Sequence, residues 1–167
     1  MCLVLIAWRV HPRYPLIVAA NRDEFYARPT LPAQHWPGAS AMIAGKDLEA
    51  GGSWMGVDAS GRFAAVTNFR ELEQGPADAR SRGELVTDYL LGNTPAESYL
   101  AGLAERTNHY RGYNLLLADG DELYCASNRD VPIRHLQPGV HGVCNGPMDS
   151  DWPKVKRGRQ LLAKAVD

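Results

Sequence analysis

Two apolar runs near the N-terminus constrain the fold more than any other feature of this sequence. Residues 2–10 and 16–20 are rich in β-forming side chains, and Pro12 and Pro15 between them cannot continue a hydrogen-bonded ladder. The pair is therefore predicted to form a β-hairpin. Because both runs are apolar throughout, we expect both strands to be covered on both faces, as in a layered fold.

The rest of the chain predicts groups of strands that alternate with helices. Residues 22–40, with three prolines, are expected to form an ordered loop, and residues 70–82 a surface loop. Further strands are predicted over 42–45, 51–57, 63–69, 113–118, 122–127 and 140–145, and helices over 83–91, 95–107 and 152–166. The two adjacent helices should pack on one face of the sheet. This order indicates an antiparallel α+β layer fold in one domain, residues 1–167.

The start of the second helix carries a capping signal. Thr94 is expected to be the N-cap, with Pro95 at the first helical position and Glu97 completing a capping box.

Composition and charge exclude several classes of function. The formal net charge is −1 and no block of Lys or Arg is present, so we expect no nucleic-acid or anionic-membrane partner. No stretch approaches the roughly 20 apolar residues that span a bilayer, and the opening run lacks the basic start of a signal peptide. The five histidines show no metal-binding spacing and the three cysteines form no Cys-x-x-Cys pair. We expect a cytoplasmic protein without metal or cofactor that acts on a small molecule.

Cys2 is the sharpest chemical signal. Methionine aminopeptidases remove Met1 before a small residue, which would leave Cys2 with a thiol and a free α-amine on one residue. The reference pKa values of these two groups, about 8.5 and 7.7–8.0, are close enough for the amine to serve as the base for its own nucleophile. Such a site needs no catalytic histidine. The alternative is a small apolar residue in an edge strand.

Other candidates follow the ends of predicted strands. Asp23, just after the second strand, could hold the α-amine of Cys2, and Arg22 could stabilise the thiolate or bind an anionic group, although a charged turn explains both residues as well. Asn68 and Asn145 each end an apolar strand, where a side-chain amide could donate to an oxyanion or simply begin a turn. Gly51-Gly52 could let backbone approach a ligand or only turn the chain.

Several blocks together resemble one family. The Asn-Arg-Asp-Glu string at residues 21–24 is typical of the NRDE, or transport-and-Golgi-organisation, family. The matching blocks run in family order: Met1-Cys2 and residues 19–29, 51–56, 67–68, 81–86, 113–115 and 152–154. The resemblance implies a four-layer αββα sandwich of antiparallel sheets, similar to N-terminal-nucleophile (Ntn) hydrolases. Family members usually continue past the last helix predicted here, so the chain would be a fragment or a short form.

The resemblance also implies roles for individual residues. More distantly, the chain is similar to the cysteine Ntn amidases that include bile-salt hydrolases and penicillin acylases. In that pattern Cys2 attacks an amide carbonyl, Asp23 orients its amine, and Asn68 and Asn145 hold the oxyanion and the amide. The residues expected to contact the substrate are Asn21, Arg22, Glu24, Trp54, Arg82 and Lys154. The alternatives are a heme or acyl-CoA/lipid carrier that uses the same cleft without chemistry, and a structural domain with a relic site.

Overall fold

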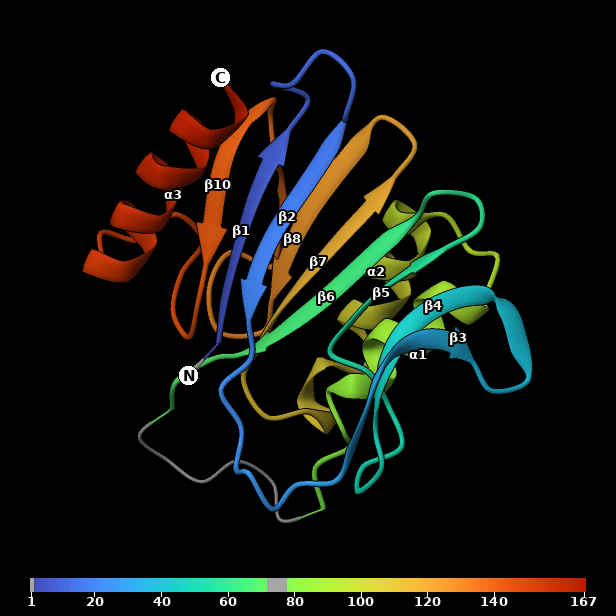
Figure 1. Ribbon diagram of the computed structural model, residues 1–167. Helices are drawn as coiled ribbons and strands as arrows, with labels where there is room; N and C mark the ends of the chain where they lie inside the picture. The colour runs from blue at the N-terminus through green and yellow to red at the C-terminus, as the bar shows by residue number, and fades with distance from the viewer. Residues whose placement is uncertain (1, 72–77) are drawn as a thin grey trace.

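Two antiparallel sheets form the centre of the computed structural model, which describes residues 2–71 and 78–167 (Figure 1). The smaller sheet has the order β10 (Gly139–Val143), β1 (Leu3–Trp8), β2 (Leu16–Asn21). The larger sheet has the order β3 (Thr30–Trp36), β4 (Ala39–Asp47), β5 (Met55–Asp58), β6 (Phe63–Asn68), β7 (Tyr113–Asp119), β8 (Glu122–Ser127), β9 (Ile133–His135). The helices are α1 (Gly83–Leu91), α2 (Ala96–Ala104) and α3 (Pro153–Val166), with a 3-10 turn at Thr107–His109.

The elements stack in four layers. Helix α3 packs on β1 and β10 of the small sheet, whereas α1 and α2 pack on the larger sheet, α1 against β4, β5 and β6 and α2 against β7. One apolar cluster, which includes Ile6 and Leu116, fills the space between the sheets. A second, which includes Leu85 and Leu115, lies between the large sheet and its two helices. The expected αββα sandwich of antiparallel sheets is confirmed.

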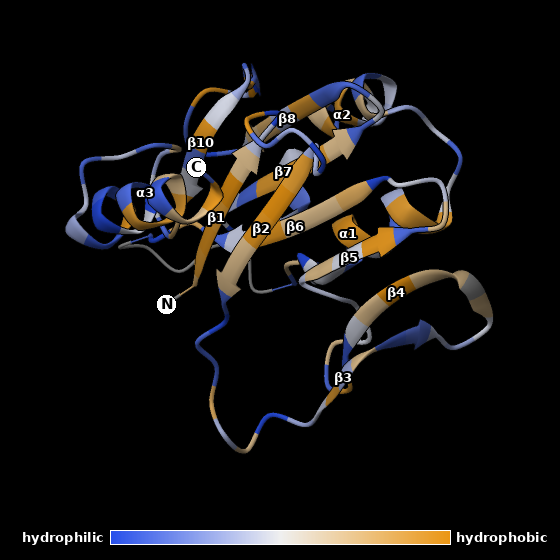
Figure 2. Ribbon diagram, turned by 45° about the horizontal axis from the view of Figure 1, so that its top comes forward, coloured by the Kyte–Doolittle hydropathy of each residue, from blue (hydrophilic) through white to orange (hydrophobic). Residues whose placement is uncertain are grey.

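The position of β1 between two layers explains why its sequence is apolar throughout. Val4, Ile6 and Trp8 belong to the cluster between the sheets, whereas Leu5 and Ala7 pack against α3. Successive side chains of a strand point to opposite faces, so a strand covered on both sides needs apolar residues at every position. Figure 2 shows β1 in hydrophobic colours between its two neighbouring layers. The prediction of two covered faces is confirmed for β1.

The same prediction is wrong for β2. This strand lies at the edge of the small sheet, and Ala19, Ala20 and Asn21 are exposed. Only its first half, with Leu16 and Val18, packs against the core between the sheets. Alanine is compatible with either environment, so the composition of the run does not reveal the position of the strand in the sheet.

Two other expectations require correction. Residues 22–40 are not a loop throughout, because β3 and the start of β4 occupy much of this range. β3 is an edge strand whose register shifts between Leu31 and Gln34, which is how it accommodates Pro32. The strand β9 was not predicted. The surface loop expected over 70–82 falls partly on residues 72–77, which lie outside the described residues.

The predicted capping box does not form. The helix α2 begins at Ala96, and Pro95 is its N-cap residue. The N-cap side chain makes no hydrogen bond to the first turn of the helix. Instead Asp119, at the end of β7, accepts a hydrogen bond of 3.0 Å from the backbone N–H of Ala96. A carboxylate from a distant strand therefore satisfies one of the free donors at this helix end.

None of the helices within residues 2–71 and 78–167 has the length and apolar character needed to cross a bilayer.

A charged pair ties β10 to the segment that precedes α3. His141 Nδ1 lies 2.8 Å from Asp149 Oδ2, and His141 Nε2 lies 2.8 Å from the carbonyl oxygen of Gln137. Both partners are acceptors, so this geometry favours the imidazolium form, in which both ring nitrogens donate. The hydrogen bond to Asp149 raises the pKa of His141 and outweighs the opposing effect of burial.

This pair predicts that stability decreases at alkaline pH. Because the pKa of His141 is higher in the folded protein, its contribution is complete below about pH 6.5 and is lost as the pH rises through the raised value. His141→Gln should lower the free energy of unfolding at pH 6 by about 2 kcal/mol and weaken the decrease between pH 6 and pH 9. Urea unfolding at both pH values measures this. An equally steep decrease in the variant would rule out His141 as its source.

Candidate functional site

The ends of several strands meet at one end of the two sheets. β1 runs antiparallel to β2 and β10, so Leu3 lies opposite Asn21 and Val4 lies opposite Val143. The start of β1 therefore lies beside the residues that follow β2 and β10. The end of β6 reaches the same place, because the backbone N–H of Arg70 bonds to the carbonyl oxygen of Asn145 at 2.8 Å. This register gathers Cys2 and the polar strand ends at one edge.

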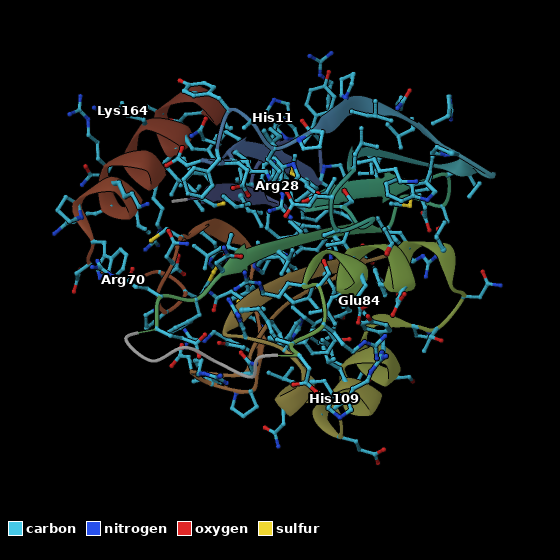
Figure 3. All side chains as sticks on the ribbon, turned by 90° about the horizontal axis from the view of Figure 1, so that it is seen from below. His11, Arg28, Arg70, Glu84, His109 and Lys164 are labelled. Carbon is cyan, nitrogen blue, oxygen red and sulfur yellow. The ribbon has the colours of Figure 1, made fainter. Side chains whose placement is uncertain are left out.

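A cavity of about 530 Å³ opens at this edge. Figure 3 views the molecule from this end, with Arg28 near the middle of the view and Glu84 on α1. The lining residues come from the residue before β1, the loop after β2, the start of β3, the end of β4 and the turn after it, the segment before β5, the end of β6, the residues around the start of α1, and Arg111 before β7. The volume is in the range of small-molecule sites.

Seven of the ten residues predicted from the sequence line this cavity. They are Cys2, Arg22, Asp23, Glu24, Trp54, Asn68 and Arg82. The sequence separates these residues by up to 80 positions. Strand pairing brings the first part of the chain and Asn68 together, and the contact of Ser53 with Gly83 joins the segment of Trp54 to that of Arg82.

The other three predicted residues each donate a hydrogen bond to a residue that lines the cavity. Asn21 Nδ2 donates to Asp23 Oδ1 at 2.5 Å. Asn145 Nδ2 donates to the carbonyl oxygen of Asn68 at 2.8 Å. Lys154 Nζ donates to the carbonyl oxygen of Cys2 at 3.3 Å. These three side chains therefore hold the backbone or the carboxylate of a lining residue.

A buried polar network lies behind Asn68 and Asn145, and the sequence analysis did not predict it. Thr67 Oγ1 donates to the carbonyl oxygen of Cys144 at 2.7 Å, and Asn114 Nδ2 lies 3.0 Å from the carbonyl oxygen of Gly146. These contacts fix the chain on both sides of Asn145 and join the large sheet to the segment after β10. Asn114 is 1% exposed, and a buried amide with such partners is costly to replace. A polar Asn within an otherwise apolar strand was the feature of the sequence that could have indicated this buried network.

Asp47 is a second residue that sequence reasoning missed. Its Oδ2 accepts from Arg28 Nε at 2.8 Å and from Arg22 at 3.3 Å, while its Oδ1 accepts from the backbone N–H groups of Glu49 and Ala50. Burial alone would raise the pKa of Asp47, but these hydrogen bonds outweigh it and the pKa lies below its usual value. Arg22 is thereby held by carboxylates of Asp47 and Glu24.

Gly51 and Gly52, which precede Ser53 and Trp54, have different structural roles. Gly51 has a φ of +80° and turns the chain, which was one of the two hypotheses for this glycine pair. Gly52 allows close approach of backbone, although the neighbour is the start of α1 and not a ligand. A Cβ on Gly52 would lie 2.5 Å from the carbonyl carbon of Gly83. The Ser53 N–H bonds to the Gly83 oxygen at 3.2 Å and completes this contact.

Gly52→Ala should therefore be strongly destabilising. The methyl group would meet backbone atoms, which cannot move away as a flexible side chain can. We expect the free energy of unfolding to fall by about 2 kcal/mol, as for overpacked cores, which chemical denaturation measures. Gly102→Ala is a matched control, because its Cβ would meet nothing within 4 Å and alanine favours a helix interior. Equal stability of the two variants would contradict the close contact.

The other thiols differ from Cys2 in their surroundings. Cys125 and Cys144 are buried, whereas Cys2 is partly exposed. Burial raises the pKa of Cys125 to about 12, which disfavours a reactive thiolate. In the part of the chain that the structure describes, no group of three or more His, Cys, Asp or Glu side chains is arranged to hold a metal ion.

The fold and the site together define an α+β sandwich with a cavity lined by many charged residues at the end of its sheets. The family model described as Transport and Golgi organisation 2 matches residues 1–167, and the chain belongs to this family. The resemblance expected from the NRDE blocks is confirmed.

Curated relatives agree with this assignment. The mouse Transport and Golgi organization 2 homolog and the human Transport and Golgi organization protein 2 homolog are each 37% identical over 180 residues, covering 100% of this chain and 65% of the relative. The Drosophila melanogaster Transport and Golgi organization protein 2 is 31% identical over 184 residues, covering 99% of this chain and 65% of that protein. The chain thus spans 65% of the length of these relatives.

Proposed function

We propose that this protein is an N-terminal-cysteine amidohydrolase that cleaves a small-molecule amide through an acyl-enzyme on Cys2. The main observation in support is that Cys2, Asp23 and Asn68 line one cavity. Cys2 directly precedes β1, the central strand of the small sheet. The strand that follows Cys2 is not an edge strand, because β1 has neighbours on both sides. A partly exposed thiol in a polar cavity is suited to nucleophilic chemistry.

The proposed reaction begins after removal of Met1. The freed α-amine of Cys2 takes the proton from Sγ, and the thiolate forms a bond to the amide carbonyl carbon. The carbonyl oxygen becomes an oxyanion, for which Asn68 is the proposed donor. The C–N bond then breaks, and the leaving amine takes the proton from the α-ammonium group. Water attacks the resulting thioester, which releases a carboxylic acid and restores the thiol.

Neighbouring residues support this sequence of steps by holding the nucleophile. Lys154 Nζ donates to the carbonyl oxygen of Cys2 at 3.3 Å, which limits motion of the residue that carries both base and nucleophile. Asp23 is the proposed partner of the α-ammonium group, and Asn21 fixes its carboxylate with the bond of 2.5 Å. Positioning of the reacting groups in this way contributes to catalysis without any additional chemistry.

Intact-mass analysis of the purified protein, before and after brief treatment with iodoacetamide, tests the proposal. We expect Met1 to be absent and one rapid modification to map to Cys2, while the buried Cys125 and Cys144 react slowly. Screening of amides should then give turnover. Retention of Met1 in active protein would contradict the role of the α-amine. A Cys2 thiol no more reactive than the other two would contradict a nucleophile and favour binding without chemistry, which titration with heme and acyl-CoA would examine.

A further inference from the structure

The arginines that line the cavity beside Cys2 differ in their partners. They are Arg22, Arg28, Arg80, Arg82 and Arg111. Arginines that line a site either pair with carboxylates of the protein or remain available to an anionic ligand. The partners of each guanidinium decide which of these applies.

Carboxylates of the protein form ion pairs with Arg22 and Arg28. Arg28 Nε lies 2.8 Å from Asp47 Oδ2, and a second nitrogen of Arg28 lies 3.3 Å from Glu49. Arg22 contacts Glu24 at 3.2 Å and Asp47 at 3.3 Å. These arginines already have anionic partners, and their role is to fix the loop after β2 against the end of β4.

Arg82 and Arg111 differ from these two arginines. Within residues 2–71 and 78–167, neither of them forms an ion pair with a carboxylate, whereas Arg80 pairs with Glu84 at 2.7 Å. One nitrogen of Arg82 donates to the carbonyl oxygen of Gly112 at 3.0 Å, which fixes its guanidinium in the cavity wall. The nearby Glu71 is engaged by Arg129 at 2.7 Å and by the N–H of Gly112.

The hydrogen bond to Gly112 holds Arg82 beside the residue that follows Arg111, and both arginines line the same cavity as Cys2. Burial and then the positive charge of Arg111 lower the pKa of Arg82. Two like charges held together in a ligand-sized space are stabilised when an anion binds between them.

We propose that Arg82 and Arg111 form an anion subsite, so that the substrate of Cys2 carries a carboxylate or phosphate group near its scissile amide. This inference rests on the proposed function and names its substrate class. The planar guanidinium of each residue can donate two hydrogen bonds to such an oxyanion. Arg22 and Arg28 already have carboxylate partners and are not expected to compete for this group.

The test compares an anionic and a neutral alkylating probe of similar size. In both reactions the Cys2 thiolate displaces iodide and forms an S–CH₂ bond, with iodoacetate bringing a carboxylate and iodoacetamide a neutral amide. We expect the ratio of the iodoacetate rate to the iodoacetamide rate at Cys2 to exceed that of N-acetylcysteine by about tenfold, as for a charge-assisted contact. Dividing by the iodoacetamide rate removes differences in intrinsic thiol reactivity.

Matched variants assign the effect to the two arginines. Arg82→Gln and Arg111→Gln should each lower the ratio by about threefold, and the double variant should return it to the N-acetylcysteine value. Arg111 is exposed, so its variant is expected to fold. Arg157→Gln removes an exposed positive charge from α3, outside the cavity lining, and should leave the ratio unchanged. A wild-type ratio equal to that of N-acetylcysteine, or a raised ratio that survives the double variant, would overturn the proposal.

Competing anions identify the group that the subsite accepts. Protection of Cys2 from iodoacetate by acetate assigns a carboxylate, and protection by inorganic phosphate assigns a phosphate. Protection by neither anion beyond that of sodium chloride at equal ionic strength would count against the subsite. Failure of the proposed function is distinguishable, because loss of all amide turnover with a raised, arginine-dependent ratio would leave an anion-binding cavity without hydrolysis.

Discussion

Cys2→Ala is expected to reduce amide hydrolysis by roughly 10⁴-fold or more, to the background rate, because it removes the atom that forms the acyl-enzyme. The fold should be unaffected. Cys2 precedes β1 and is only partly buried, so the free energy of unfolding should change by less than about 1 kcal/mol. Initial rates on the best amide from a screen, with thermal unfolding of the same samples, measure both quantities.

Two variants make this test specific. Cys2→Ser also presents a small second residue, so Met1 should still be removed and the α-amine retained, yet the hydroxyl is a weaker nucleophile than a thiol. It should therefore be strongly impaired as well. Cys125→Ala removes a buried thiol from the core between the sheets and should keep full turnover. Undiminished hydrolysis by Cys2→Ala would refute the acyl-enzyme, whereas loss of activity in Cys125→Ala with an intact fold would place chemistry elsewhere.

The sequence predicted the layered fold because the pattern of β1 allows few alternatives. A central strand with apolar residues at every position must be covered on both faces, and β1 is covered by the large sheet and by α3. The predictions were wrong where a contact between distant parts of the chain outweighed the preference of the local sequence. The proline in β3 indicated a loop, but an edge strand tolerates it. The cap of α2 comes from Asp119, 23 residues away, and not from the neighbouring Thr94.

The candidate site shows the same division. Residues that directly follow or precede strands were predictable, because strand ends carry the polar groups of a site on a rigid scaffold. Asp47 and Asn114 were not. The strand predicted over 42–45 ended before Asp47, Asn114 lies inside a strand, and the importance of both depends on partners from other elements. Asp47 lies at the end of β4 and holds Arg22 and Arg28 of the loop after β2. Asn114 gains its role only from the packing of β7 beside the segment after β10.

The two asparagines assigned to the oxyanion can be separated by their surroundings. The side chain of Asn68 is exposed at the cavity, whereas Asn145 is 7% exposed and its Nδ2 donates to the Asn68 carbonyl oxygen. The backbone beyond Asn68 is also fixed, since Phe69 N–H donates to Gly112 and Arg70 N–H donates to Asn145, each at 2.8 Å. The backbone that carries Asn68 is therefore fixed on both sides of the proposed donor, which favours a preorganised position.

Asn68→Ala should lower kcat by about 10²-fold with little change in KM or stability, because a donor that acts on the transition state affects mainly the chemical step. Asn145→Ala should instead lower the free energy of unfolding by about 2 kcal/mol and reduce kcat less, because it removes a buried support. Asn93→Ala, exposed in the loop between α1 and α2, is the control. Steady-state kinetics and urea unfolding of the three variants give the comparison. If Asn145→Ala lost more kcat than Asn68→Ala at unchanged stability, Asn145 would be the donor, and its amide would have to turn from Asn68 toward the substrate.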